Sequence, residues 1–154
     1  MGLDMYLKAR ISYSGYNFVP QDEKNTFAKI VDVIGIEVDK DSTLSVEVAI
    51  GYWRKANVIH KWFVDNVQSG TDDCGSYFVP REALKELLAL CKETLTWLEK
   101  PENVDSPLPS TSGFFFGSTD YDEWYKKDIE YTIEVINKCL LLPDNYYFYY
   151  ESSW

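Results

Sequence analysis

Alternation of apolar and polar positions predicts the first β-strand. Leu3, Met5, Leu7, Ala9 and Ile11 are separated by polar side chains or tyrosine over residues 3–11, which is the period of a half-buried strand. Residues 44–50 alternate in the same way, and residues 30–38 form another apolar run that ends at the turn-forming residues 39–43. We therefore predict strands at 30–38 and 44–50, paired with each other as a hairpin.

After Gly51 the spacing of apolar residues changes to three and four, which predicts helices. The first predicted helix covers residues 52–67 and ends at Gly70. A stronger apolar stripe over residues 84–98, after Pro80 and before Pro101, predicts the second helix. The third helix begins at Thr119 to Asp122, which have the spacing of a capping box with Asp in place of Glu, and continues to residue 140.

The aromatic residues 146–150 follow Pro143 and predict a last strand that pairs with one of the first three. Residues 101–113 are rich in Pro and Ser and predict a surface loop, too short to separate two domains. The order of elements predicts a single domain over residues 1–154. Its fold class is α+β, with an antiparallel sheet of about four strands and three helices packed on one face.

Charge and cysteine content narrow the classes of function. The formal net charge of -10 disfavours direct binding to nucleic acid or to anionic membranes. Cys74, Cys91 and Cys139 are too few and too scattered for a disulfide framework. The N-terminal residues lack a leader pattern, and the sequence contains no apolar run long enough to span a membrane. We therefore expect a cytoplasmic protein with no membrane partner.

Aromatic residues make up 16% of the chain, above the usual share, and gather in two segments, 51–63 and 113–125. Both segments mix rings with hydrogen-bonding side chains, as the linings of binding sites do. We predict that they form one aromatic-polar cleft between the first and third helices. The predicted ligand-binding residues are Trp53, Arg54, Lys55, Asn57, His60, Ser118, Thr119, Asp120, Tyr121, Asp122 and Trp124.

Each of these residues also has a structural interpretation. His60 could serve as a general base or a metal ligand, or it could lie at the edge of the core and bond to the backbone. Arg54 and Lys55 could attract a phosphate, or they could belong to a solvated surface. The predicted N-terminus of the third helix could bind an anion, although the carboxylates of Asp120 and Asp122 favour capping instead.

His60 and Cys74 are the candidates for catalysis. His60 is the single histidine of the chain, and Cys74 lies in a Gly-flanked loop, so together they would resemble a thiol nucleophile and its base. The aspartates at 72, 73, 120, 122 and 128 could form an oxygen-rich metal site, but they lack the spacing of a calcium loop. We therefore expect no metal and no cofactor, and we favour binding over catalysis.

Several segments resemble one family of small, uncharacterised bacteriophage and prophage proteins. They are residues 1–7 (MGLDMYL), 52–63 (YWRKANVIHKWF), 72–75 (DDCG), 113–122 (GFFFGSTDYD) and 150–154 (YESSW). The resemblance covers nearly the whole chain and transfers no activity or catalytic residue. It implies a phage or prophage setting, in which accessory proteins bind host factors or intercept defence pathways.

Together these observations predict a non-catalytic accessory protein that binds a small, polar, nucleotide-like ligand or a host protein, with counter-defence as one such role. One alternative is an acidic inhibitor that occupies the basic surface of a host nucleic-acid-binding protein. Another is a small hydrolase or transferase that uses His60 with Cys74 or with aspartates. The sequence does not determine the oligomeric state.

Overall fold

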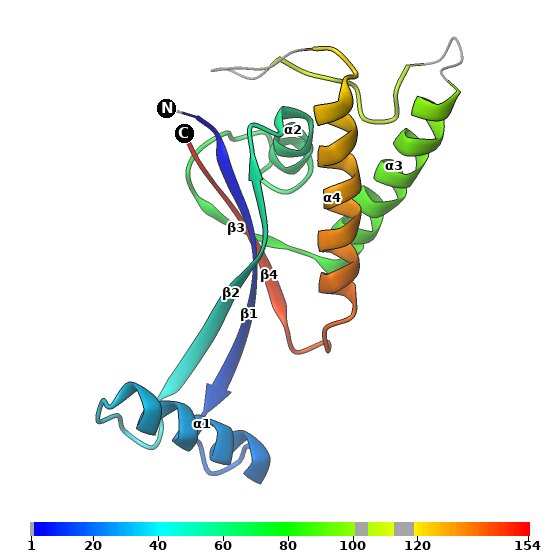
Figure 1. Ribbon diagram of the computed structural model, residues 1–154. Helices are drawn as coiled ribbons and strands as arrows, with labels where there is room; N and C mark the ends of the chain where they lie inside the picture. The colour runs from blue at the N-terminus through cyan, green and yellow to red at the C-terminus, as the bar shows by residue number, and fades with distance from the viewer. Residues whose placement is uncertain (1, 101–104, 113–118) are drawn as a thin grey trace. The chain divides into compact units, whose positions relative to one another are not determined.

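The computed structural model describes residues 2–100, 105–112 and 119–154. These residues form β1 (Asp4–Ser14), α1 (Gln21–Ile34), β2 (Thr43–Arg54), α2 (Asn57–Asn66), β3 (Ser76–Val79), α3 (Arg81–Glu99), α4 (Glu123–Leu140) and β4 (Tyr147–Ser153) (Figure 1). The predicted α+β class with a four-stranded antiparallel sheet is confirmed, with four helices in place of three.

The chain divides into two compact units, one made of residues 1–9 and 49–154 and the other of residues 10–48. We call them the first and the second unit. Strands β1 and β2 each contribute residues to both units. The expectation of a single domain stays a prediction.

The strands lie in the order β2-β1-β4-β3. The last strand, β4, lies between β1 and β3, and its predicted pairing with one of the first strands is confirmed by its pairing with β1. Its other neighbour, β3, was not predicted as a strand, because it is only four residues long. β3 and β4 run antiparallel, with Ser76 opposite Glu151 and Val79 opposite Phe148.

The predicted strand at residues 30–38 is wrong. Residues 21–34 form α1, which ends at Gly35 with φ 68°, where the Gly35 N–H donates to the Val31 carbonyl at 3.0 Å. A left-handed glycine is a common helix C-cap. Ile30, Val31, Val33 and Ile34 favour strands by propensity, but the helical context and the glycine cap prevail. The neighbour of β2 in the sheet is consequently β1.

Within the second unit, a tight contact holds α1 near the turn after β1. Phe27 is the buried residue of α1. A Cβ atom at Gly15 would lie 2.2 Å from the Lys40 carbonyl oxygen and 3.0 Å from the Phe27 ring. The Gly15 N–H also donates to the Ser42 carbonyl at 3.1 Å. Only glycine fits this close approach.

The core of the first unit lies between the sheet and the helices α2, α3 and α4, which lie on the same side of it in Figure 1. The β1 residues Met5 and Leu7 are fully buried, and their neighbours in sequence are not. The predicted second helix is confirmed as α3, whose Leu84, Leu87 and Cys91 are also fully buried. Across the described ranges, no helix combines the length and apolar character needed to cross a membrane.

The predicted start of the first helix is also wrong. Residues 52–54 continue β2, and α2 begins at Asn57 after Lys55, which has φ 61°. The Lys55 N–H donates to the Leu3 carbonyl at 2.8 Å. Pairing with β1 therefore keeps this segment extended, although its apolar residues follow a helical spacing.

Asp122, in place of the predicted Thr119, is the N-cap of α4. Its carboxylate oxygen accepts the backbone N–H groups of Trp124 at 3.0 Å and of Tyr125 at 2.9 Å. This arrangement satisfies two of the N–H groups that a helix start leaves without partners.

We predict that Asp122→Ala lowers the free energy of unfolding by about 1 kcal/mol, because alanine cannot accept these N–H groups. Asp122→Asn keeps an acceptor oxygen and should retain most of the stability. Urea unfolding of the three proteins measures the difference. Equal losses in the two variants would contradict the capping role.

Candidate functional site

Trp53, which the sequence places in the predicted cleft, lies in the core of the first unit. Its side chain is 2% exposed, and its indole Nε1 donates to Thr132 Oγ1 of α4 at 3.0 Å. Its ring packs against Phe63 and Tyr131, with centroids 6.5 and 5.6 Å away. Trp53 thus connects β2, α2 and α4, and its N–H group is already used.

The cationic side chains that follow Trp53 in the sequence, Arg54 and Lys55, lie at the surface. The side chain of Arg54 is 67% exposed, with its Nε 4.0 Å from Asp4 Oδ1. Lys55 is exposed in the link between β2 and α2, where Asn57 donates its N–H to the Lys55 carbonyl at 2.9 Å. Arg54 and Lys55 therefore lie outside the helix on which they were predicted.

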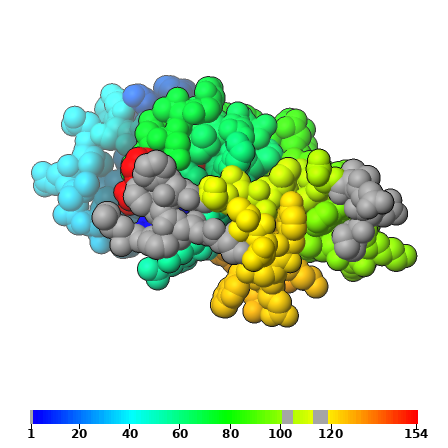
Figure 2. Space-filling view, turned by 90° about the horizontal axis from the view of Figure 1, so that it is seen from above, coloured from blue at the N-terminus to red at the C-terminus, as the bar shows by residue number. Residues whose placement is uncertain are grey.

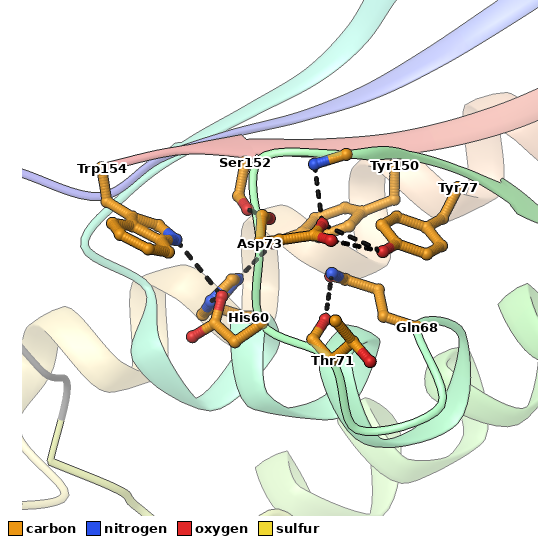
Figure 3. Close-up of polar contacts among 10 residues, drawn as sticks. His60, Gln68, Thr71, Asp73, Tyr77, Tyr150, Ser152 and Trp154 are labelled. Carbon is orange, nitrogen blue, oxygen red and sulfur yellow. Dashed lines mark hydrogen bonds and ion pairs between the residues drawn. The ribbon is translucent and has the colours of Figure 1, made fainter.

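His60 is buried on α2 and bonded through both ring nitrogens (Figure 3). Its Nδ1 lies 2.7 Å from the Tyr150 hydroxyl of β4, and its Nε2 lies 3.0 Å from Asp72 Oδ1. The indole Nε1 of Trp154 donates to the same Asp72 oxygen at 3.2 Å. We call these four side chains the histidine cluster.

The hydrogen bonds of the histidine cluster have a consistent direction. The Asp72 carboxylate only accepts, so His60 Nε2 carries a proton. Burial raises the pKa of Tyr150 far above its ordinary value, so its hydroxyl stays protonated. The Tyr150 O–H can then donate to Nδ1 of a neutral imidazole. His60 is thus a boundary histidine, bonded to side chains in place of the backbone carbonyl that the sequence interpretation named.

The adjacent aspartate, Asp73, holds its own loop. Its carboxylate accepts the Tyr77 hydroxyl at 2.9 Å and the Gly75 N–H at 2.8 Å, and its carbonyl accepts the Ser152 hydroxyl at 3.2 Å (Figure 3). The hydrogen bond to Asp73 raises the pKa of Tyr77. Asp73 therefore fastens the loop between α2 and β3 to β4, and Asp72 fastens it to α2 and to Trp154.

The predicted thiol and imidazole pair is not assembled in this arrangement. Cys74 is exposed on the same loop, but both nitrogens of His60 are bonded to Tyr150 and Asp72. Burial raises the pKa of Cys91 and of Cys139 to about 12, so these thiols stay protonated. Over the residues that the structure describes, no three His, Cys, Asp or Glu side chains could together hold a metal ion.

The turn before α4 packs against α3. The Tyr121 ring lies 4.9 Å from Trp97 and 5.0 Å from Tyr125. Thr119 accepts the Ser110 hydroxyl through its carbonyl at 2.5 Å. Residues 105–112 lie against the start of α4, in yellow-green and yellow in Figure 2, where the Tyr125 hydroxyl donates to the Leu108 carbonyl at 2.5 Å.

The remaining predicted ligand residues lie near this turn. Asp120 and Asp122 are exposed, and Trp124 is 72% exposed with Lys127 Nζ 4.8 Å above its ring. Ser118 lies outside the described residues. The contacts of the described side chains place Tyr121 against α3 and His60 against β4. They do not join the two predicted groups in one cleft.

Asp128 is a carboxyl group with a clearly perturbed acidity. It is half-buried on α4. Burial, with a smaller contribution from the negative charge of Asp122, raises the pKa of Asp128 to about 6. Ionisation of Asp128 therefore lowers the free energy of unfolding.

A second surface gathers aromatic side chains on the other side of the sheet. In β1 and β4 the buried residues alternate with side chains that face away from the helices. Residues of β2 and β3 continue this surface. Its rings are Tyr6, Tyr52, Phe78, Tyr147 and Tyr149. We call this surface, within the first unit, the open face.

The rings of the open face form two groups. Tyr6 lies 5.2 Å from Tyr52, and Phe78 lies 6.2 Å from Tyr147 and 6.0 Å from Tyr149. Phe78 is 51% exposed and Tyr147 is 52% exposed. Exposed rings at this density are typical of partner-binding surfaces.

The charged groups of the open face are paired with one another. Lys8 Nζ lies 2.5 Å from Glu151 Oε2, which joins the central strands β1 and β4. The Tyr52 hydroxyl donates to Asp4 Oδ1 at 2.5 Å, and hydrogen bonding to this carboxylate raises the pKa of Tyr52. The open face therefore presents ring surfaces, with its central polar groups already satisfied.

Sequence reasoning missed the open face because it assigned each strand singly. The alternation of Tyr147, Tyr149 and Glu151 in the last strand carries the signal, and it matches Tyr6 and Lys8 in the first. The partners of His60 could not be found in this way, since Asp72 lies in a loop.

Comparisons with protein-family models, with curated proteins and with solved structures each found no significant match.

We predict that Tyr150→Phe lowers the free energy of unfolding by about 1–3 kcal/mol, because it leaves His60 Nδ1 without a donor. Phenylalanine keeps the stacking on Phe63, whose ring lies 4.0 Å away. Tyr147→Phe on the open face is the matched control and should be nearly neutral. Chemical denaturation measures both. A loss of the same size in the control would contradict a specific role for the Tyr150 hydroxyl.

We predict that Asp128 makes stability fall as pH rises. Its folded pKa of about 6 exceeds the unfolded value, so its stabilising contribution is full below about pH 4 and is lost up to about pH 6. Asp128→Asn should remove this loss. From pH 4 to pH 7 it should gain about 1–2 kcal/mol relative to the natural chain, a value reduced for partial exposure. Denaturation at both pH values tests this, and parallel pH profiles would contradict it.

Proposed function

We propose that this chain is a non-catalytic accessory binding protein of phage or prophage type, and that it binds a host protein through the open face. The observation that carries this proposal is the gathering of five exposed or half-buried rings on one face of the sheet, opposite α2, α3 and α4. Aromatic residues are enriched at the centres of protein interfaces, where they account for much of the binding energy.

The pairing of polar groups favours a protein over a small polar ligand. A small ligand is fixed by a few polar groups that converge on it. On the open face, Lys8 is engaged by Glu151 and the Tyr52 hydroxyl by Asp4. The rings of Phe78 and Tyr147 are exposed. Trp53, one of the rings predicted to line the cleft, is buried and bonded to Thr132. The geometry thus supports the protein-binding alternative.

The histidine cluster argues against the hydrolase or transferase alternative. General base catalysis by His60 would need its unprotonated ring nitrogen to face a substrate, and Nδ1 faces the Tyr150 hydroxyl instead. Tyr150 lies fully buried behind His60 and is not accessible to a substrate. The cluster is best explained as a fastening between α2, β4 and the loop that joins α2 to β3.

We predict that a photo-crosslinking amino acid at Phe78 or Tyr147 captures one host protein from a bacterial lysate, and that the same amino acid at Leu141 does not. Leu141 is 86% exposed at the end of α4. The captured protein, once purified, should bind the natural chain. The double variant Phe78→Ser and Tyr147→Ser should weaken its binding tenfold or more, as expected for the loss of central aromatic contacts.

The matched control is the double variant Trp124→Ser and Leu141→Ser, which removes two exposed apolar side chains from α4. It should leave the dissociation constant unchanged in a calorimetric titration. Equal weakening by both double variants would contradict a role for the open face. A nucleotide that raises the melting temperature, with no effect of the open-face variants on any partner, would favour the small-ligand alternative instead.

A further inference from the structure

The second unit carries a hollow that the open face does not explain. The hollow has a volume of about 410 Å³ and lies between α1 and the residues that follow it. Its lining includes the side chains of Phe27, Val31, Asp32, Ile36, Glu37 and Val38. Ligand pockets have volumes of about 300–1,000 Å³, so this one is large enough for a few side chains of a partner segment.

The surface around the hollow is unusually apolar. Val33 is 84% exposed, Ile34 is 52% exposed and Ile36 is 56% exposed. Phe27 is the buried residue of α1, so this helix leaves most of its apolar side chains accessible. Contiguous apolar surface beside a hollow indicates a docking site.

Charge distinguishes the possible occupants. The residues that line the hollow include two carboxylates, Asp32 and Glu37, and no Lys or Arg. Neither carboxylate forms an ion pair within the described ranges. Residues 10–48 contain four Lys and Arg against seven Asp and Glu, a formal charge of -3. A basic partner would therefore be attracted, whereas a second copy would bring like charges together.

We propose that this hollow receives a short segment of another protein in which apolar residues alternate with Lys or Arg. Apolar side chains of the segment fill the space between Phe27, Val31 and Ile36, and its cations pair with Asp32 and Glu37. This site lies within the second unit, so it does not depend on the open face or on its proposed partner.

The test is a titration of the whole chain, followed through its backbone amide resonances, with three seven-residue peptides. One alternates Leu with Lys, the second Leu with Glu and the third Ser with Lys. The Leu–Lys peptide should shift the amides of residues 27–38 and bind at least tenfold more tightly than either of the others. Equal binding by the Ser–Lys peptide would overturn the apolar part of the proposal.

Variants test whether binding is specific to the hollow. Asp32→Asn with Glu37→Gln should weaken binding of the Leu–Lys peptide about tenfold, and Ile36→Ser should weaken it similarly. Asp39→Asn with Asp41→Asn removes the same charge from neighbouring positions outside the lining and is the matched control. It should have less than a twofold effect. Circular dichroism of each variant must match the natural chain for its result to be used.

The other outcomes each overturn the proposal. Equal weakening by the two charge variants would mean attraction to net charge alone. Peptide-induced shifts that map to residues outside 10–48 would place binding elsewhere. Self-association in sedimentation that Ile36→Ser abolishes would assign the hollow to a second copy of this chain.

Discussion

Burial of one side of the central strands under α2, α3 and α4 is the constraint on which the first unit depends. Met5 and Leu7 of β1 and Phe148 and Tyr150 of β4 are almost wholly buried. Because side chains alternate across a strand, this burial fixes the register and sends the remaining residues to the other face. The open face is therefore a direct consequence of the core. A shift of one residue in β4 would bury Tyr149 and Glu151 and expose Tyr150, which makes the present arrangement strongly specified.

The histidine cluster shows how the same constraint extends to polar groups. Tyr150 brings a hydroxyl into the core, where an unpaired group would cost about 1–3 kcal/mol. His60 supplies the acceptor, and Asp72 in turn accepts from His60. These hydrogen bonds connect the buried strand β4 with the loop that carries Asp72, so the Tyr150 hydroxyl and both His60 ring nitrogens have partners inside the protein. The buried Tyr150 hydroxyl is thereby linked through His60 to Asp72 in the loop between α2 and β3.

The sequence predicted the helices and strands that are marked by their own local pattern. It did not predict the segments whose structure depends on pairing with distant residues. The stripe of α3 and the alternation of β1 each identify one element, because the burial of each is expressed in its own period. Residues 52–54 follow a helical period but continue β2, because backbone pairing with β1 extends to Lys55. In α1, β-branched residues suggested a strand, although Gly35 provides the stop signal of a helix. The contacts of the predicted site residues were missed for the same reason. Trp53 was placed on a helix, and the partners of His60 lie 12 and 90 residues away in the sequence.

The open face and the hollow of the second unit differ in how their charged groups are paired. On the open face, Lys8 and Arg54 are matched by Glu151 and Asp4, so the surface is locally neutral in a chain of net charge -10. Its contribution to binding must then come from rings and shape, with little dependence on salt. Around the hollow, Asp32 and Glu37 have no cationic partner in the described structure, so attraction there depends on charge and weakens with salt. Salt dependence is thus the property by which binding at one surface is distinguished from binding at the other, even before either partner is identified.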